Sequence, residues 1–493
     1  MTKTISTTQE LQQALRQLQP NTHLIVEDGT YDLGNLNIEN VRSNADHPIH
    51  IQARNVGRAT LSSPEPRKLH IRNTPHLTLS GFHFDQLSIQ ITDATHVRIS
   101  QSTFHNTQDA VHWIDFHNAS FGRVDHCDFG SRMTKGAYIN VHRPSQHTQI
   151  DHNHFHDRPD LERNGGQAIG LHGNHGHRWD IAALVEHNLF DRVDGEHELF
   201  CVKSHQNIFR HNTFINCQGY ISIRGGDYNK IYDNYFFHFG PQKTGSDVPA
   251  AARLQGLHNI VSNNYLFGLN ACVTAQFSDT LVPYISPEDR KTWWQNHTDT
   301  DSYALGIHEV AYRTSKNNAV LHNTAINCQH LFHWTIKGLK KELPPHKEPH
   351  RGNRKSQYPP EAWLVANNLA INIADFAFER ANRLDKSDIP PPGYERDFTW
   401  IGNILSGQCD TFGQGRSLTE DGFNSSNIQL CESDRKGLYT TLPLMAATPY
   451  PTSLAKHEPH NPDLLYPKHP HVGCHLNQPP LTSDQVGPNA IVK

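Results

Sequence analysis

The segment between Asp194 and Gly226, DGEHELFCVKSHQNIFRHNTFINCQGYISIRGG, contains the residue types that proton abstraction and metal binding need. Glu196 and Glu198 are two residues apart in EHELFCVKS, so on a strand their carboxylates point to the same side of a sheet. Two such carboxylates repel each other unless a cation lies between them, and calcium is a hard cation that takes carboxylate and amide oxygens. Lys203 follows in the same stretch, and Arg224 lies 21 residues beyond Lys203.

These residues meet in space only if the chain repeats at about that interval. A short unit does recur: an apolar or β-branched strand, a polar pair that is often His-Asn or Asp-Asn, one further residue, and then Phe, as in TQIDHNHF and NIFRHNTF. Successive units end 20 to 59 residues apart, which suits the coils of a β-solenoid with loops inserted in some of them. The units end at Phe84, Phe104, Phe129, Phe155, Phe190, Phe214, Phe236, Leu266, Ala325, Ala370 and Leu405.

The repeat predicts an all-β chain in which short strands pair in parallel with the coils above and below. Inward aromatic and aliphatic side chains then stack in files along a narrow core. Asn before the inward aromatic suits a tight bend, because Asn tolerates the left-handed conformation and its amide can form a ladder with its counterparts. The regularly spaced leucines of leucine-rich repeats are absent. The apolar residues alternate with a period near two residues, which excludes helical repeats. On such coils Lys203 and Arg224 should lie nearly above one another.

Asn164 adds a third oxygen ligand to the two glutamates. It lies in RNGG, 32 residues before Glu196, which is about one coil with an insertion. An amide oxygen and two carboxylates form a partial calcium shell that water or substrate would complete. For an isolated cluster, a surface salt-bridge ladder along the solenoid would be the simpler interpretation. The order and spacing over three coils favour a catalytic site.

The ends and inserts of the chain predict one domain. Thr7 and Glu10 form a capping-box pattern before Leu11 and Leu15, so residues 1–20 are expected to cap the first coil with an amphipathic helix. We expect a single solenoid over 1–408, with loop insertions at 282–317 and 337–360. Residues 409–493 are expected to be an irregular or capping extension of the same domain.

Composition excludes several classes of protein. The formal charge of −5 argues against a general nucleic-acid or membrane-surface binder. There is no long apolar run for a membrane span, and the first 18 residues lack the pattern of a secretory leader, so the sequence as read is cytoplasmic unless a leader was removed. The eight cysteines form no CxxC pair, which favours buried thiols over a zinc or redox motif.

The chain resembles polysaccharide lyase family 6, which contains alginate lyases and the dermatan-cleaving chondroitinase B. The resemblance covers most of the chain and is most specific in NGGQ, DGEHELFCVKS and ISIRGG, which occur in the family's order and spacing; IVEDGTYDLGNLNIEN, LTLSGFHF, AARLQGLHNIVSNNY and DQVGP add to it. It implies a right-handed parallel β-helix and a carbon-oxygen lyase. By resemblance Lys203 is the catalytic base, Arg224 is its acid partner and Arg253 contacts the sugar carboxylate. Asn164, Glu196 and Glu198 match the family's calcium ligands.

The family's reaction suits these residue types. In β-elimination from a 4-linked uronate, the C5 proton is too weakly acidic unless the adjacent carboxylate is neutralised. Calcium and Arg253 would stabilise the charge that builds there. Arg224 hardly ever gives up a proton, so we expect it to stabilise developing charge and position the leaving oxygen.

The sequence departs from the family pattern at two positions. Gly225 stands where the family commonly has His, and Gln167 stands where it commonly has an acidic residue. These changes leave the base and metal ligands in place but affect substrate contacts. Alginate is the leading substrate, because every sugar carries a carboxylate and no sulfate pocket is needed. Dermatan or chondroitin sulfate is the second choice, favoured by the basic stretch 337–355, and a non-catalytic polyuronate-binding solenoid is the alternative from another class.

Two groups of histidines raise the question of a transition-metal site. His152, His154 and His156 alternate near one bend, and His172, His175 and His177 follow in the next coil. With 37 histidines in the chain, we favour bend and surface positions, because alternating residues near a bend rarely converge with a third ligand.

Overall fold

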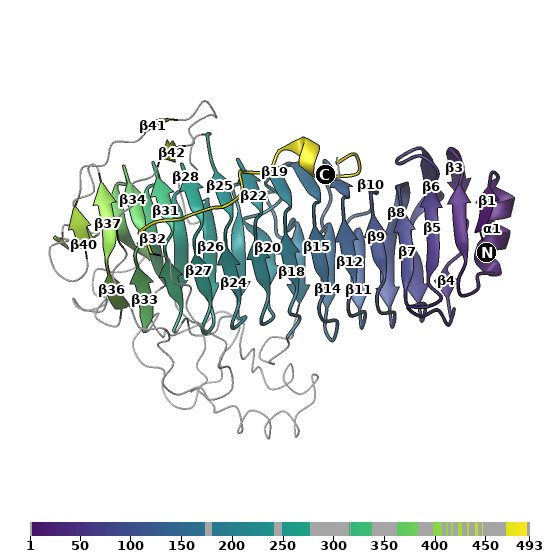
Figure 1. Cartoon of the computed structure of the whole chain (residues 1–493), viewed down its shortest axis with the longest axis horizontal. Helices are drawn as coiled ribbons and strands as arrows, with labels where there is room; N and C mark the ends of the chain where they lie inside the picture. Colours follow the sequence, from purple (N-terminus) through teal and green to yellow (C-terminus); the bar gives the residue numbers. More distant parts are fainter. Residues whose placement is uncertain are drawn as a thin grey trace, which may run out of the picture.

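The computed structural model describes residues 2–172, 180–240, 249–276, 315, 317–337, 362–382, 398–406 and 470–490, together with short strands between 411 and 446. The chain winds into coils of three short strands each, and equivalent strands stack in parallel along one long axis (Figure 1). This arrangement is the parallel β-helix that the repeat predicts. The predicted insertions at 282–317 and 337–360 lie almost wholly outside the described residues. Among the described residues, no helix has the length and apolar character needed to cross a membrane.

The first row of strands forms one 14-stranded parallel sheet. Each member pairs in register with its counterpart one coil away; for example, Val185 lies opposite Phe209. The members are β1 (Thr2–Ile5), β2 (His23–Val26), β5 (Ile49–Ala53), β7 (Leu77–Ser80), β9 (Arg98–Ser100), β12 (Arg123–Asp125), β15 (Gln149–Asp151), β18 (Leu184–Glu186), β21 (Ile208–Arg210), β24 (Lys230–Tyr232), β27 (Ile260–Ser262), β30 (Ala319–Leu321), β33 (Trp363–Ala366) and β36 (Phe398–Ile401).

The second row follows the bend after the first. Two long strands, β6 and β8, continue from this row into the third. The second row consists of β3 (Gly29–Asp32), β6 (Ala59–Arg72), β8 (Phe82–Thr92), β10 (Thr103–His105), β13 (Asp128–Phe129), β16 (His154–Arg158), β19 (Leu189–Val193), β22 (Thr213–Ile215), β25 (Tyr235–Phe237), β28 (Tyr265–Phe267), β31 (Thr324–Ile326), β34 (Leu369–Ile371), β37 (Asn403–Ser406) and β40 (Phe423–Ser425).

The third row completes each coil and carries the predicted catalytic residues. Its strands are β4 (Ile38–Glu39), β11 (Ile114–His117), β14 (Ile139–His142), β17 (Ile169–His172), β20 (Glu198–Val202), β23 (Tyr220–Arg224), β26 (Ala250–Gln255), β29 (Ala271–Gln276), β32 (His330–Lys337), β35 (Asp375–Asn382) and β38 (Thr411–Phe412). The remaining elements are β39 (Arg416–Ser417), β41 (Cys431–Glu432), β42 (Tyr439–Thr441) and the 3₁₀ helix η3 (Ser483–Gln485).

The core is a file of stacked aromatic rings, as the repeat predicts. Consecutive rings from Phe84 to Phe236 stack with centroids 4.5 to 5.3 Å apart, and Leu266, Ala325, Ala370 and Leu405 continue the same register. Burying one large apolar side chain per coil in this file contributes about 1.5–3 kcal/mol each. The described cysteine side chains belong to the buried interior and form no disulfides.

An asparagine ladder runs beside the aromatic file, as predicted. The side-chain amide of each member donates to the Oδ1 of the next at 2.9 to 3.1 Å, and the ladder runs through Asn153, Asn188, Asn212, Asn234, Asn264, Asn323, Asn368 and Asn403. The ladder Asn residues do not adopt the left-handed conformation that the sequence predicts for them. It falls on the residue before each ladder Asn, as at His152, His187 and His211, where φ is near 55°.

Histidine at this left-handed position explains part of the unusual histidine content. His is one of the residue types that enter this region more readily than most. The rings of His126, His152, His187 and His211 stack outside the bends of consecutive coils, with centroids 4.9 to 5.0 Å apart. These histidines are therefore structural residues of the bend.

The N-terminal end is capped as predicted. Helix α1 (Thr8–Arg16) begins with a complete capping box, in which Thr7 Oγ1 accepts from Glu10 N at 3.2 Å and Glu10 Oε2 accepts from Thr7 N at 3.2 Å. Leu11 and Leu15 are buried on its inner face. Strand β1 precedes the helix and pairs with the first coil.

The described part of the C-terminal extension, residues 470–490, runs back along the side of the coils (Figure 1). Its contacts move steadily toward earlier coils. Gly473 N donates to Asn367 O at 2.8 Å, Leu481 N donates to Thr213 Oγ1 at 2.8 Å, and Gly487 N donates to His152 O at 2.9 Å. We call residues 470–490 the strap.

Candidate active site

The third row brings Lys203 and Arg224 to the same level of neighbouring coils. Val202 lies opposite Ile223 in the pairing of β20 with β23, so the next residues along each strand are Lys203 and Arg224. Val202 and Ile223 point into the core and are fully buried, whereas Lys203 and Arg224 are partly exposed on the outer face. The strand register therefore places Lys203 and Arg224 side by side, as predicted.

Glu198 lies between two guanidinium groups on this face. Its Oε1 forms an ion pair with Arg253 Nη2, its Oε2 lies 3.5 Å from Arg224 Nη1, and Ser222 Oγ donates to Oε1 at 3.2 Å. Burial alone would raise the pKa of Glu198, but Arg253 and Arg224 outweigh that effect and lower it. Glu198 is therefore a carboxylate that holds both arginines in place.

The two glutamates do not lie on one strand, although the sequence predicts that they do. Strand β20 begins at Glu198, so Glu196 lies in the bend before it. A bulge at Leu199 shifts the register, because Glu198 lies opposite Tyr220 and Phe200 lies opposite Ile221. Simple alternation along one strand therefore does not describe the pair.

Glu196 faces the loop that contains Asn164. Gly165, the residue after Asn164, donates its backbone N–H to Glu196 Oε2 at 2.7 Å. Burial raises the pKa of Glu196 and the nearby Glu198 carboxylate adds to the rise, while the hydrogen bond from Gly165 opposes it. Asn164 itself is exposed. The predicted set of Asn164, Glu196 and Glu198 thus offers one amide oxygen and two carboxylates, of which Glu198 is buried and Glu196 is partly buried. These oxygen ligands are of the type that fits a hard cation.

Arg253 is more buried than we expect of a residue whose only role is to contact the substrate. Its side chain is 6 % exposed, its Nη1 donates to Tyr220 Oη at 3.0 Å, and its guanidinium lies 5.3 Å from the centre of the Tyr220 ring. Tyr220 was not among the predicted site residues. The alternation in YISIR was a signal for it, because Ser222 and Arg224 lie on the same outer face.

Glycines allow the close approach of the coils at this site. A Cβ on Gly226 would lie 2.1 Å from Ser204 O, and a Cβ on Gly166 would lie 2.1 Å from Gly195 O. Gly225, at one of the two positions where the sequence departs from the family pattern, has φ of 109°, which disfavours any side chain there. The backbone at this position is therefore suited to glycine.

Sequence reasoning also missed a buried arginine that supports the Asn164 loop. Arg158 donates to Gln167 O at 3.0 Å and to Gly136 O at 2.9 Å, and its guanidinium lies 4.8 Å from the centre of the Tyr138 ring. Gln167, the second departure from the family pattern, follows the two glycines of this loop. Arg158 thus fixes the loop from below through backbone carbonyls.

A row of histidines continues the outer face upstream of Lys203. His117, His142 and His172 hold the position equivalent to Lys203 on the three preceding coils. The endings IDFH, INVH, IGLH and FCVK were the sequence signal for this row. Burial lowers the pKa of His172, and the neighbouring Lys203 adds to the effect, so His172 is neutral.

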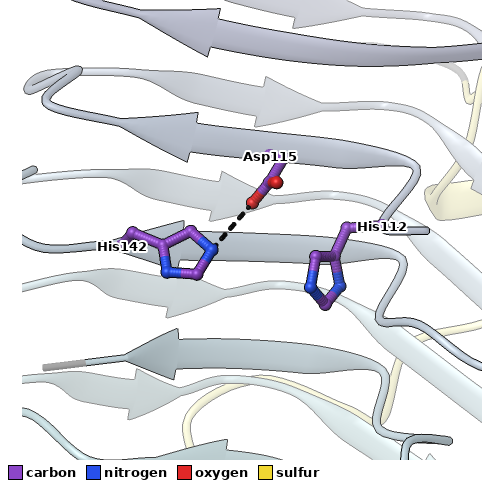
Figure 2. A group of neighbouring side chains, drawn as sticks. All are labelled: His112, Asp115 and His142. Atoms are coloured by element: carbon purple, nitrogen blue, oxygen red, sulfur yellow. Dashed lines mark ion pairs between the residues drawn. The ribbon is translucent and has the colours of Figure 1, made fainter. Parts of the chain in front are cut away.

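Two histidines of this row, His117 and His142, contact the buried carboxylate of Asp115. His142 Nε2 lies 3.2 Å from Asp115 Oδ1, as Figure 2 shows. His117 Nε2, which the figure does not draw, lies 2.9 Å from Oδ2. Burial alone would raise the pKa of Asp115, but hydrogen bonds from His117 and His142 outweigh it and lower that pKa. His112 lies beside the pair, and burial lowers its pKa to about 4. The face upstream of Lys203 is therefore lined with imidazole groups.

Comparisons with known proteins identify the family of the chain and structures that share its fold. The sequence model of the Chondroitinase B family matches residues 5–277. No curated protein matches the chain.

Solved structures with the same fold include the alginate lyase AlyGC of polysaccharide lyase family 6, which is 23 % identical, with a TM-score of 0.70 over 99 % of this chain and 58 % of AlyGC. A mannuronic acid specific family 6 lyase from human gut microbiota is 20 % identical, with a TM-score of 0.66 over 87 % of this chain and 91 % of the other. A family 6 lyase from Pseudopedobacter saltans is 17 % identical, with a TM-score of 0.63 over 99 % of both chains. The chain thus spans less than two thirds of the length of AlyGC.

Proposed function

The chain belongs to the chondroitinase B family, within polysaccharide lyase family 6, and from this premise we propose that it cleaves a 4-linked uronic-acid polysaccharide by β-elimination, with alginate as the leading substrate. The observation that carries the proposal is the alignment of Lys203 with Arg224 on neighbouring coils, beside the Glu198 carboxylate. AlyGC and the gut lyase are described as an alginate lyase and a mannuronic acid specific lyase, which supports alginate over other uronates.

Lys203 is proposed as the base that removes the C5 proton. It lies at the end of β20, where its backbone N–H is held by Leu171 O at 2.9 Å, and its side chain shares the outer face with Arg224. A positioned base of this kind contributes about 10²–10⁴-fold to the rate.

Arg224 is proposed to stabilise the charge that develops during elimination. As C5 loses its proton, the C4–O bond breaks, a C4–C5 double bond forms and the leaving oxygen takes a proton from solvent or from the protonated base. The Arg224 side chain is 26 % exposed and held by Glu198, so its guanidinium is both accessible and fixed in direction. A preorganised cation of this kind lowers the barrier because it needs no rearrangement as charge builds.

The substrate carboxylate must be neutralised for the C5 proton to leave. Asn164, Glu196 and Glu198 are the residues that would hold a calcium ion, which supplies positive charge to that carboxylate when bound. Arg253 is proposed to assist from below by keeping Glu198 ionised and in place. An anionic polysaccharide is thus the partner that this face suits.

The histidine row suits an extended substrate. His117, His142 and His172 present one side chain per coil, and neighbouring coils lie about 4.8 Å apart. A chain of sugars could follow this row away from Lys203 and meet an imidazole on each coil. We propose that the row contacts the sugars upstream or downstream of the bond that is cleaved.

The test is the ultraviolet absorbance of unsaturated uronate product on polymannuronate, polyguluronate and dermatan sulfate. Wild-type protein should give signal on an alginate block, and Lys203→Ala should lose it by at least about 10²-fold. Lys230→Ala is the matched control, because Lys230 begins β24 on the first row, away from the site. No product from folded wild-type protein on any of the three polymers would overturn the proposal in favour of a polyuronate-binding solenoid.

Cleavage of dermatan sulfate is the second candidate, because the matching family model is that of chondroitinase B. Signal on dermatan sulfate with none on alginate would establish it. The basic stretch 337–355 that favoured this substrate lies outside the described residues except for Lys337.

A further inference from the structure

A second cluster of metal-ligand residues lies on the second row of strands, whereas Lys203 lies on the third. Asp128 on β13 pairs directly with His154 on β16, and His156 is two residues further along the same strand. Phe129 and Phe155 point into the core in the same register. Asp128, His154 and His156 therefore all point outward from neighbouring strands.

Their ligand atoms already lie at the spacing of a coordination shell. His154 Nδ1 lies 3.3 Å from Asp128 Oδ2, and His156 Nε2 lies 3.1 Å from Oδ1. One atom from each of the three residues lies within 4.8 Å of both others. Around a tetrahedral zinc ion, ligand atoms at ordinary bond lengths are about 3.4 Å apart. The group needs little movement to close around a cation.

The orientation of one imidazole is fixed from behind. His156 Nδ1 lies 2.8 Å from Asp157 Oδ2, and Arg192 Nε holds the other oxygen of Asp157 at 2.9 Å. A metal-binding histidine ordinarily donates its second ring N–H to a carboxylate, which directs the other nitrogen to the metal. Asp157 supplies that carboxylate and leaves His156 Nε2 facing Asp128.

The cluster is accessible, and the end of the strap lies against it. The side chains of Asp128, His154 and His156 are 30, 17 and 24 % exposed, so an ion can enter and a fourth ligand position stays open. Gly487 lies so close that a Cβ there would be 3.6 Å from His154 Cβ and 4.0 Å from Asp128 Oδ2. The site thus lies where the strap meets the coils.

We propose that Asp128, His154 and His156 bind a divalent transition cation, zinc first, at the junction of two coils and the strap. Two imidazoles and one carboxylate suit zinc and its neighbours in the first transition series, whereas calcium takes oxygen ligands. The site is independent of Asn164, Glu196 and Glu198, and it is chemically different from them. Its third ligand comes from the preceding coil, which the spacing of the HxH pattern alone does not reveal.

The cluster of His112, Asp115 and His142 is not suited to bind the same cation, although it also contains two histidines and one aspartate (Figure 2). His112 Nδ1 accepts the backbone N–H of Ala137 at 2.9 Å, so in the neutral ring the other nitrogen carries the proton and offers no lone pair. Asn140 also donates to Asp115 Oδ1 at 3.1 Å. Asp115 and His142 therefore provide a matched control rather than a second proposal.

The experiment uses the full chain without a histidine tag, treated with chelator and dialysed. Zinc chloride is titrated by calorimetry in excess calcium, and cobalt(II) is added separately to record its visible absorption. Wild-type protein should bind one equivalent of zinc, and cobalt should give the intense bands of a tetrahedral site. His156→Gln and Asp128→Asn should each weaken zinc binding at least tenfold, and Asp157→Asn should weaken it less.

The control variant Asp115→Asn/His142→Gln should bind zinc as wild type does. Zinc should also raise the unfolding temperature of wild type and of this control, but not that of His156→Gln. If zinc affinity is unchanged in both His156→Gln and Asp128→Asn, or is lost only in the control, the proposal is wrong. If these variants do not fold, wild-type protein that gives no tetrahedral cobalt bands overturns it in the same way.

Discussion

Arg253 and Glu198 form an ion pair that is almost fully shielded from solvent, with 6 % of each side chain exposed. The pair joins β20 to β26 across the intervening strand β23, and Ser222 on that strand donates to the same carboxylate. Removing one partner of a buried pair leaves the other charge without compensation. The pair is therefore a sensitive place to separate stability from activity.

Arg253→Ala should lower the free energy of unfolding by about 3–5 kcal/mol, because it leaves the Glu198 carboxylate buried beside Arg224 alone. Urea denaturation measures the change. The control is Arg210→Ala, whose pair with Glu186 is on the first row and partly exposed, and it should cost about 0–1 kcal/mol. Equal losses in the two variants would contradict the structural role. With Arg253→Lys, a rise in KM at unchanged stability would support the predicted contact with the sugar carboxylate.

Calcium should stabilise the wild-type protein and should be needed for full activity. At calcium concentrations about 100 times Kd, the expected gain is about 2.7 kcal/mol. Glu196→Gln removes a partly buried carboxylate from the proposed ligand set and should abolish this gain, as measured by thermal unfolding with calcium or chelator. Glu186→Gln on the first row is the control and should keep it. A wild-type protein whose unfolding and activity ignore chelator has no functional calcium site.

Breaking the asparagine ladder should cost more than removing an exposed amide. Asn212→Ala removes the acceptor of the buried Asn188 backbone N–H, which is left without a partner, while the Asn188 side-chain amide keeps Ile150 O and Glu186 O. Each unsatisfied group costs about 1–3 kcal/mol. Asn55→Ala, which removes an exposed hydrogen bond to Asp28, should change stability by less than about 0.5 kcal/mol. Chemical denaturation of the two variants gives the comparison, and similar values would argue against the ladder.

Stability should fall steeply in acid because of buried carboxylates on the first row. Burial alone would raise the pKa of Asp125, but Arg98 and His126 outweigh it and hold that pKa well below its ordinary range. A carboxyl with a lowered folded pKa stabilises the protein above its unfolded value of about 3.9, and this contribution is lost as pH falls. Asp125→Asn should therefore be less stable than wild type at pH 7 and should lose less stability between pH 5 and pH 3. Parallel pH profiles for the two proteins would exclude this role.

The coil architecture could be predicted because every coil must fill the same core position with a large apolar side chain. Phe155, Phe190 and Phe214 recur at one position, since each must fill the same place in the file. The register that places Lys203 beside Arg224 follows from the same period. Contacts between equivalent positions of neighbouring coils can thus be predicted from the spacing of the repeats.

Other parts of the site depend on contacts that the repeat spacing does not predict. The bulge at Leu199 breaks the alternation on which the Glu196 and Glu198 prediction rested. Arg158 is buried by stacking on Tyr138 and by carbonyls of two loops, and nothing in its sequence neighbours indicates this. Asp128 meets His156 from the preceding coil through irregular spacing. The roles proposed for Lys203, Arg224 and the calcium ligands stay predictions that the variants above test.

The strap changes how the solenoid can come apart. A stack of coils that touch only their neighbours can fray from either end, one coil at a time. Hydrogen bonds from the strap join residues 150, 212 and 268 positions apart, at Thr324, Asn263 and Thr213. Late coils therefore cannot peel away without also releasing a segment anchored on early ones. This coupling makes unfolding of the coils concerted, and the fold cannot be completed before residues 470–490 have been synthesised.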